Sequence, residues 1–88
     1  MGRIRDKIMR KLGFENINNI IIKNNYQEKP PKEWKMNVRR NFYNTYKEFY
    51  VPIVIQQVNY NRWFLIDGYT SYLIAKEKGI KYVPVERK

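Results

Sequence analysis

The chain has 88 residues, of which 18 are Lys or Arg and 8 are Asp or Glu, so its formal net charge is +10. It contains no Cys and no His, which excludes disulfides, thiolate metal sites, cysteine nucleophiles and catalysis by histidine. The length suits a single domain with a modest hydrophobic core. A positive charge of this size favours a polyanionic partner, either nucleic acid or an anionic membrane surface.

Residues 2–12 are predicted to form a short amphipathic helix, because Ile4, Ile8 and Leu12 recur every four residues and Gly13 can end it. We expect the apolar stripe to dock on the core and the basic residues to contact nucleic acid or an acidic partner. A solvated basic face is the plain alternative, and an anionic membrane is a rival partner. The candidate contact residues of this helix are Arg3, Arg5, Lys7, Arg10 and Lys11.

A strand is predicted over residues 20–23, ended by Asn24 and Asn25. A second helix follows, with Pro31 in its first turn and Glu33 near the positive end of its dipole. Its apolar positions, spaced by four, four and seven, are Trp34, Val38, Phe42 and Phe49. Its candidate nucleic-acid contacts are Lys32, Lys35, Arg39, Arg40 and Lys47, interrupted by Tyr43. This pattern fits a phosphate-tracking surface and an ordinary amphipathic helix of a basic protein equally well.

The C-terminal part predicts a hairpin, a helix and a last strand. The hairpin runs over residues 52–56 and 63–66 with a turn at 59–61, and its second strand is apolar throughout, as expected if both faces are covered. Arg62 adds a candidate contact. Residues 69–78 are predicted to be helical, with Gly79 as the left-handed stop. The whole chain, residues 1–88, is predicted to be one α+β domain of order α-β-α-β-β-α-β with a small mixed sheet.

Four segments of this C-terminal half resemble the ParB/sulfiredoxin-like superfamily, strongest over residues 51–86. They are Pro52-Ile53-Val54, Leu65-Ile66-Asp67-Gly68, Ala75-Lys76-Glu77-Lys78-Gly79 and Val83-Pro84-Val85. The resemblance implies that fold for the chain, with a strand that ends in Gly and leads directly into a helix. Gly68 should then be needed at this junction, and Leu73 and Ala75 should pack the helix on the sheet.

The residues after the junction depart from the superfamily. Partition proteins place Glu and Arg-rich residues there to hold nucleotide phosphates, and sulfiredoxins place a Cys nucleophile and an Arg. Here the slots hold Tyr69, Thr70 and Ser71, so sulfiredoxin chemistry, which needs a thiolate, is excluded. Gly68 to Ser71 remain a candidate anion or phosphate loop at a helix N-terminus. The plainer interpretation is that Asp67 or Gly68 caps the helix and the hydroxyls are ordinary first-turn residues.

We therefore expect a non-catalytic, ParB-like nucleic-acid-binding protein from a phage, plasmid or other mobile element, with DNA placed before RNA as partner. Two alternatives remain open. The first is a nucleotide-binding switch of the CTP or ATP type. The second is a small phage-type inhibitor or adaptor that docks on a protein–nucleic-acid machine such as a host-defence (CRISPR-type) nuclease. The oligomeric state is left open.

Neither catalysis nor a bound metal is expected from the residues present. Asp67 has no second carboxylate beside it in the sequence, whereas metal-assisted phosphodiester cleavage ordinarily uses a pair. Carboxylates are also the only usual ligand type left for a metal. We expect no cofactor other than the nucleotide of the first alternative. With no apolar run of membrane-spanning length and no signal peptide, we expect a cytoplasmic protein.

Overall fold

A computed structural model of the protein describes residues 2–88, with side chains from Ile4 onward. The helices are α1 (Gly2–Lys11), α2 (Asn24–Glu28), α3 (Glu33–Tyr46) and α4 (Tyr69–Glu77), with a short 3-10 turn, η1 (Ile17–Asn19). The strands are β1 (Phe14–Asn16), β2 (Ile20–Ile21), β3 (Ile53–Asn59), β4 (Arg62–Asp67) and β5 (Tyr82–Arg87). The expected α+β class and the order of the long elements are confirmed. The sequence pattern missed β1 and α2, because neither has a long enough periodic run to stand out.

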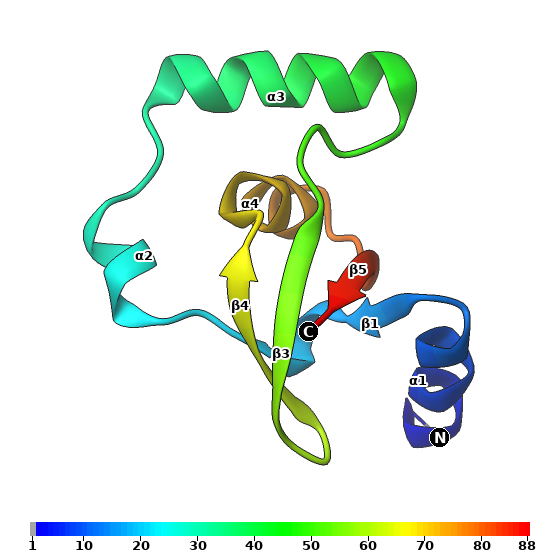
Figure 1. Ribbon diagram of the computed structural model, residues 1–88. Helices are drawn as coiled ribbons and strands as arrows, with labels where there is room; N and C mark the ends of the chain where they lie inside the picture. Colours follow the sequence, from blue (N-terminus) through cyan, green and yellow to red (C-terminus); the bar gives the residue numbers. More distant parts are fainter. Residues whose placement is uncertain (1) are drawn as a thin grey trace.

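The five strands form one mixed sheet in the order β1-β5-β3-β4-β2 (Figure 1). β3 pairs with β4 in an antiparallel hairpin and with β5 in parallel, while β2 lies parallel to β4. The short strands β1 and β2 occupy the two edges, so little unpaired backbone is presented for pairing with another chain. In this arrangement the end of β4 leads straight into α4.

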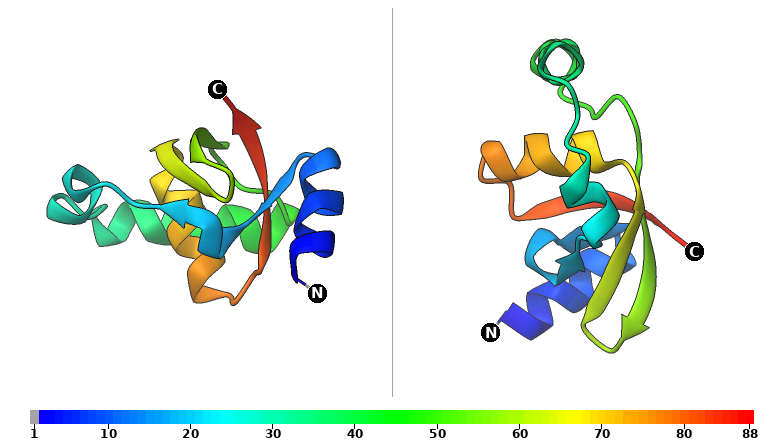
Figure 2. Two further views of the ribbon diagram at one scale, coloured as in Figure 1. Left: turned by 90° about the horizontal axis from the view of Figure 1, so that it is seen from below. Right: turned by 90° about the vertical axis from the view of Figure 1, so that its left-hand side faces the viewer.

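The core lies between the sheet and α4, and α3 covers the far side of α4 (Figures 1 and 2). The expected strand Trp63 to Ile66 is covered unequally: Trp63 and Leu65 are buried, whereas Phe64 and Ile66 are half-buried. The expectation that both faces are fully covered is therefore wrong. The buried residues that pack together as the main cluster are Ile17, Ile20, Ile53, Ile55, Trp63, Leu65, Tyr72, Ala75 and Val83.

The orientation predicted for α1 is also wrong. Ile4, Ile8 and Leu12 are 69 %, 54 % and 66 % exposed, so the apolar stripe faces outward. The helix docks by its polar side instead. Asp6 accepts hydrogen bonds from the hydroxyl of Tyr82 at 2.8 Å and from the side-chain amides of Asn16 and Asn19. Ion pairing and hydrogen bonding, rather than burial of the stripe, hold α1 in place.

The second inward contact of α1 is made by Arg10. Its Nε donates to Oε1 of Glu15 at 2.7 Å, and Nη2 of Arg87 donates to the same oxygen at 2.8 Å. Glu15 is fully buried, and the amide of Asn19 donates to its second oxygen at 3.0 Å. Because both carboxylate oxygens have partners, the cost of burying this charge is offset.

The apolar spacing of the second predicted helix did not identify its buried face. Trp34 and Val38 are 66 % and 56 % exposed, and Met36 is the buried residue of α3. The helix also ends earlier than its pattern implied: its last residue is Tyr46, the C-cap Lys47 adopts a left-handed φ of 58°, and Phe49 lies in the following loop. The physical reason is that α3 packs on α4 and not on the sheet, which leaves most of its circumference in solvent.

Candidate functional site

The junction between β4 and α4 is built around Gly68. Its φ is +87°, and a Cβ placed there would lie 2.2 Å from the carbonyl oxygen of Pro52 and 2.8 Å from Cα of Ile53. Both of these are backbone atoms, which have little freedom to move aside. Only glycine fits this backbone conformation and this close approach of two strands. The junction is thus a tight, fixed turn that sets the direction in which α4 begins.

The first turn of α4 carries no side-chain cap. Gly68 is the N-cap residue, and Asp67 Oδ1 accepts from the N–H of Gly68 at 2.8 Å rather than from the helix. The prediction that Gly68 is the N-cap residue is therefore confirmed, and the alternative that Asp67 caps the helix is wrong. The uncapped N–H groups and the positive end of the helix dipole form a local environment that favours an anion.

The two hydroxyls of this turn have different roles. Ser71 is 1 % exposed and donates a hydrogen bond to the carbonyl oxygen of Val51 at 2.6 Å, so its hydroxyl is committed to the fold. The expectation that Ser71 can donate to a phosphate is not met in this arrangement. Thr70 is 6 % exposed and accepts from Nη1 of Arg39 at 2.9 Å. Its own O–H group is therefore free to donate elsewhere.

A cavity of about 360 Å³ opens at this turn, between α4 and the segment that joins α2 to α3. Gly68, Tyr69 and Thr70 form one side of it. The basic side chains that line it are Lys29, Lys35 and Arg39. Asp67 is the one acidic residue among the lining side chains. The cavity is thus lined by three cations, an uncapped helix N-terminus and a single carboxylate. The net positive charge of this lining favours a negatively charged ligand.

Two aromatic residues, Tyr26 and Tyr69, also line the cavity. The rings of Tyr26 and Tyr69 pack with centroids 5.1 Å apart, and the hydroxyl of Tyr26 donates to the carbonyl oxygen of Ile66. Burial, together with the nearby carboxylate of Asp67, raises the pKa of Tyr26. Tyr26 belongs to α2, and Lys29 follows that helix, so both were missed from the sequence. The Pro30-Pro31 pair beside Lys29 was the available signal that the chain turns sharply there.

The structure brings only some of the predicted basic residues together. Lys35 and Arg39 meet the Gly68 loop in the cavity just described. Arg40 is instead held by Glu77 at 2.8 Å and by Glu33 at 3.1 Å, which raises the pKa of Arg40, first through the bond to Glu77. The same hydrogen bond lowers the pKa of Glu77. Arg40 therefore ties α3 to α4 within the chain.

The remaining predicted contacts are distributed over distant surfaces. Lys32 and Lys47 are exposed at the two ends of α3, and Arg62 is exposed at the start of β4. On α1, Arg10 pairs with Glu15, and the side chain of Arg3 lies outside the described residues. The exposed cations of α1 are Arg5, Lys7 and Lys11. Helix α1 lies at the opposite end of the molecule from α3, so the predicted residues do not form one continuous surface (Figure 1).

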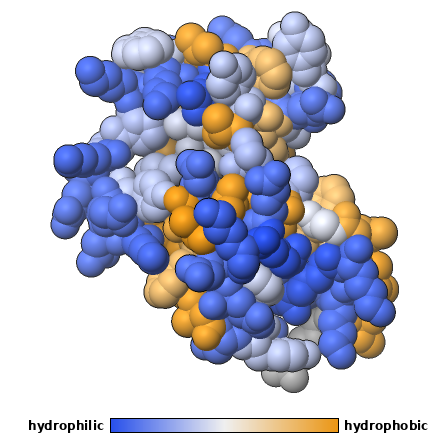
Figure 3. Space-filling model, viewed as in Figure 1, coloured by the Kyte–Doolittle hydropathy of each residue, from blue (hydrophilic) through white to orange (hydrophobic). Residues whose placement is uncertain are grey.

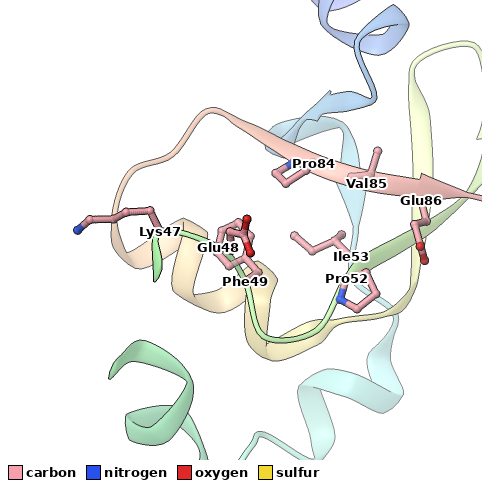
Figure 4. A pocket seen from close by; sticks show the side chains of 8 residues that line it. All are labelled: Lys47, Glu48, Phe49, Pro52, Ile53, Pro84, Val85 and Glu86. Carbon is pink, nitrogen blue, oxygen red and sulfur yellow. The ribbon is translucent and has the colours of Figure 1, made fainter. Parts of the chain in front are cut away.

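A second cavity, of about 400 Å³, lies between the loop after α3 and strand β5 (Figure 4). Its labelled side chains are mainly apolar, and the side chain of Lys47 points away from them. Glu48 and Glu86 supply its carboxylates. This lining disfavours an anion. Among the described residues, no group of three or more acidic side chains is placed to hold a metal ion.

No protein-family model matches the sequence, and no curated protein is significantly similar to it. Solved structures do match the fold. SbnI from Staphylococcus aureus, truncated at its C-terminus, has a TM-score of 0.67 at 18 % identity, over 89 % of this chain and 31 % of that one. A free serine kinase variant in complex with ADP has a TM-score of 0.68 at 12 % identity, over 85 % of this chain and 30 % of that one.

The chromosome-partitioning protein ParB from Caulobacter crescentus, truncated at its C-terminus and complexed with CTP-gamma-S, is also similar. Its TM-score is 0.63 at 15 % identity, over 85 % of this chain and 42 % of that one. The chain therefore spans less than half the length of each of these proteins. At such low identity the similarity concerns the fold alone. These matches confirm the resemblance seen in the sequence: the chain has a ParB/sulfiredoxin-like fold.

Proposed function

We propose that the cavity at the β4–α4 junction binds the phosphate groups of a nucleotide. The observation that carries this proposal is the convergence of Lys29, Lys35 and Arg39 on the uncapped first turn of α4. Phosphate binding at a helix N-terminus uses free backbone N–H groups and the helix dipole, and basic side chains add charge-assisted hydrogen bonds. The volume of about 360 Å³ falls within the range of ordinary small-molecule sites.

The comparisons support the same ligand class. A serine kinase and a partition protein of this fold are described with ADP and with CTP-gamma-S, respectively. In this chain the phosphates would lie against the uncapped first turn of α4, beside the O–H group of Thr70. We therefore favour the nucleotide-binding switch, the first alternative from the sequence, over plain nucleic-acid binding.

We further propose that binding is not followed by catalysis. The chain has neither His nor Cys, and Asp67 is the one carboxylate lining the cavity. A single carboxylate, with neither a second acid–base group nor a metal site beside it, supplies little of what catalysis of phosphoryl transfer requires. Phosphate release above background that disappears in a Thr70→Val variant would contradict this part of the proposal.

Ligand-induced thermal stabilisation tests the binding proposal. A nucleotide at about 100 times its dissociation constant should stabilise the fold by about 2.7 kcal/mol and raise the melting temperature. CTP, ATP, ADP and inorganic pyrophosphate should be compared with the corresponding nucleosides. We expect the phosphate-bearing compounds to act and the nucleosides to be inactive.

Matched variants show whether the effect belongs to this cavity. Lys35→Gln combined with Arg39→Gln should abolish the stabilisation. Lys32→Gln combined with Lys47→Gln removes the same charge from the two exposed residues that flank α3 and should leave the stabilisation intact. If no phosphate compound raises the melting temperature, or if both double variants respond equally, the proposed site is wrong.

Nucleic-acid binding is the second candidate, and the net charge of +10 favours it. Exposed cations lie on α1, on α3 and at the hairpin, which suits phosphate contacts without base readout. The affinity should then fall steeply with salt, each phosphate contact adding about −0.7 to −0.9 to the log–log slope. Electrophoretic shifts with DNA and RNA over a salt series test this. Undetectable binding at low salt would exclude it and leave the adaptor hypothesis to be examined.

A further inference from the structure

Helix α1 differs from an ordinary amphipathic helix, because its polar side contacts the protein body and its apolar side faces outward. Asp6 and Arg10 turn toward the body and bond to Tyr82 and Glu15. Ile4, Ile8 and Leu12 stand on the opposite side, each more than half exposed. A globular protein gains nothing in stability from exposing such a row, and apolar exposure of this kind marks an interaction surface.

The apolar row is bordered by cations on both sides. At about 100° per residue, Lys7 and Lys11 project from one flank of the row and Arg5 from the other. All of these cations are exposed, and none of them has a salt-bridge partner among the described residues. A second copy of the chain would bring like charges together, which opposes pairing of α1 with itself or with the basic helix α3. The charge pattern instead requires an anionic surface with an apolar layer beneath it.

The position of α1 makes its outer face accessible to a flat surface. The helix lies at the end of the molecule away from α3 (Figure 1 and the right-hand view of Figure 2). Hydrophobic side chains follow the outer edge of α1 in the space-filling view (Figure 3). Because the three apolar residues form one row along the axis, all of them can enter a planar layer together.

We propose that the outer face of α1 docks on an anionic membrane surface. Ile4, Ile8 and Leu12 enter the boundary between headgroups and acyl chains, while Lys7, Lys11 and Arg5 reach the anionic headgroups on either side. The bonds of Asp6 and Arg10 already hold the helix in this orientation, so little ordering is required on contact. No helix within residues 2–88 is long and apolar enough to cross a membrane, which fits attachment at the surface. This docking does not depend on the nucleotide cavity.

Flotation with lipid vesicles tests the proposal. The chain is mixed with vesicles of phosphatidylcholine and phosphatidylglycerol, or with vesicles of phosphatidylcholine alone. We expect flotation with the anionic vesicles and none with the neutral ones. The variant Ile4→Ser with Ile8→Ser keeps every charge, and it should weaken the partition by about tenfold or more because apolar insertion is lost.

The control uses another pair of exposed apolar residues, which lies on α3. Trp34 and Val38 have the same spacing and 66 % and 56 % exposure, close to the 69 % and 54 % of Ile4 and Ile8. The variant Trp34→Ser with Val38→Ser should float as well as the parent. Melting curves confirm that both variants fold.

Three results would overturn the proposal. Absence of flotation with anionic vesicles would leave an acidic protein groove as the occupant of this face. Equal flotation of both double variants would mean that net charge alone attracts the chain to lipid. A dimer in sedimentation analysis that dissociates in the Ile4 and Ile8 variant would assign the face to a second copy.

Discussion

Nη1 of Arg39 donates a hydrogen bond to the hydroxyl of Thr70 at 2.9 Å and so joins α3 to the first turn of α4. The contact crosses 31 residues of sequence and fixes a cation at the mouth of the candidate phosphate cavity. Arg39→Met should lower the free energy of unfolding by about 1–2 kcal/mol, because a charged hydrogen bond to a buried hydroxyl is lost. Denaturant unfolding measures this. The same variant should lose nucleotide-induced stabilisation, whereas Arg39→Lys should recover part of it.

Gly68 gives the sharpest test of the junction. Gly68→Ala should destabilise the fold by more than about 2 kcal/mol, since a left-handed φ and a clash with the Pro52 carbonyl add together. Gly79 is the matched control: it also has a positive φ, +68°, but a Cβ there meets nothing within 4 Å. Gly79→Ala should cost only about 1–2 kcal/mol. Equal melting temperatures for the two variants would contradict the close approach at Gly68.

Ile74 is the more deeply buried of two neighbouring apolar residues of α4, although Leu73 and not Ile74 packs against the main core cluster. Ile74 is 1 % exposed, whereas Leu73 is half-buried at the margin of the core cluster. Ile74→Ala should cost about 2–5 kcal/mol, and Leu73→Ala clearly less, because a half-exposed site leaves a smaller cavity. Equilibrium unfolding of both variants checks the order. A larger loss for Leu73→Ala would mean that the helix is rotated about its axis.

The pairing of Glu15 makes stability depend on pH. Burial acts to raise the pKa of Glu15, but hydrogen bonds from Arg10 and Asn19 outweigh burial and hold it below its ordinary value of 4.5. The folded state therefore binds this proton more weakly than the unfolded state. Its contribution to stability is complete above about pH 4.5 and is lost progressively as the pH falls toward the lowered folded pKa.

Replacing Glu15 tests this pairing directly. Glu15→Gln should reduce the stability at neutral pH by about 2–4 kcal/mol, because Arg10 and Arg87 lose their partner, and should flatten the decline in acid. Glu33→Gln, at a side chain that is 76 % exposed, should cost no more than about 1 kcal/mol. A Glu15→Gln variant with an unchanged acid profile would assign the pH dependence to other carboxylates.

The sequence by itself determined the long elements, the β4–α4 junction and the superfamily resemblance. Helix stops at Gly13 and Gly79, and the glycine at position 68, are local requirements of the backbone, so a local pattern reveals them. The absence of Cys and His excludes whole classes of chemistry through composition alone, because no fold can supply a thiolate or an imidazole that the chain lacks.

Only the tertiary structure decided which face of each helix is buried and which cations share a site. Periodicity identifies an apolar stripe but not what covers it. In α1 the hydrogen bonds of Asp6 and Arg10 determine which side of the helix faces the protein body, and Ile4 and Ile8 are left exposed. Lys29 and Arg39 line one cavity because the chain turns after α2, an arrangement that no local pattern encodes. The buried face of a helix and the set of side chains that line a cavity depend on many long-range contacts, and these contacts exist only once the chain has folded.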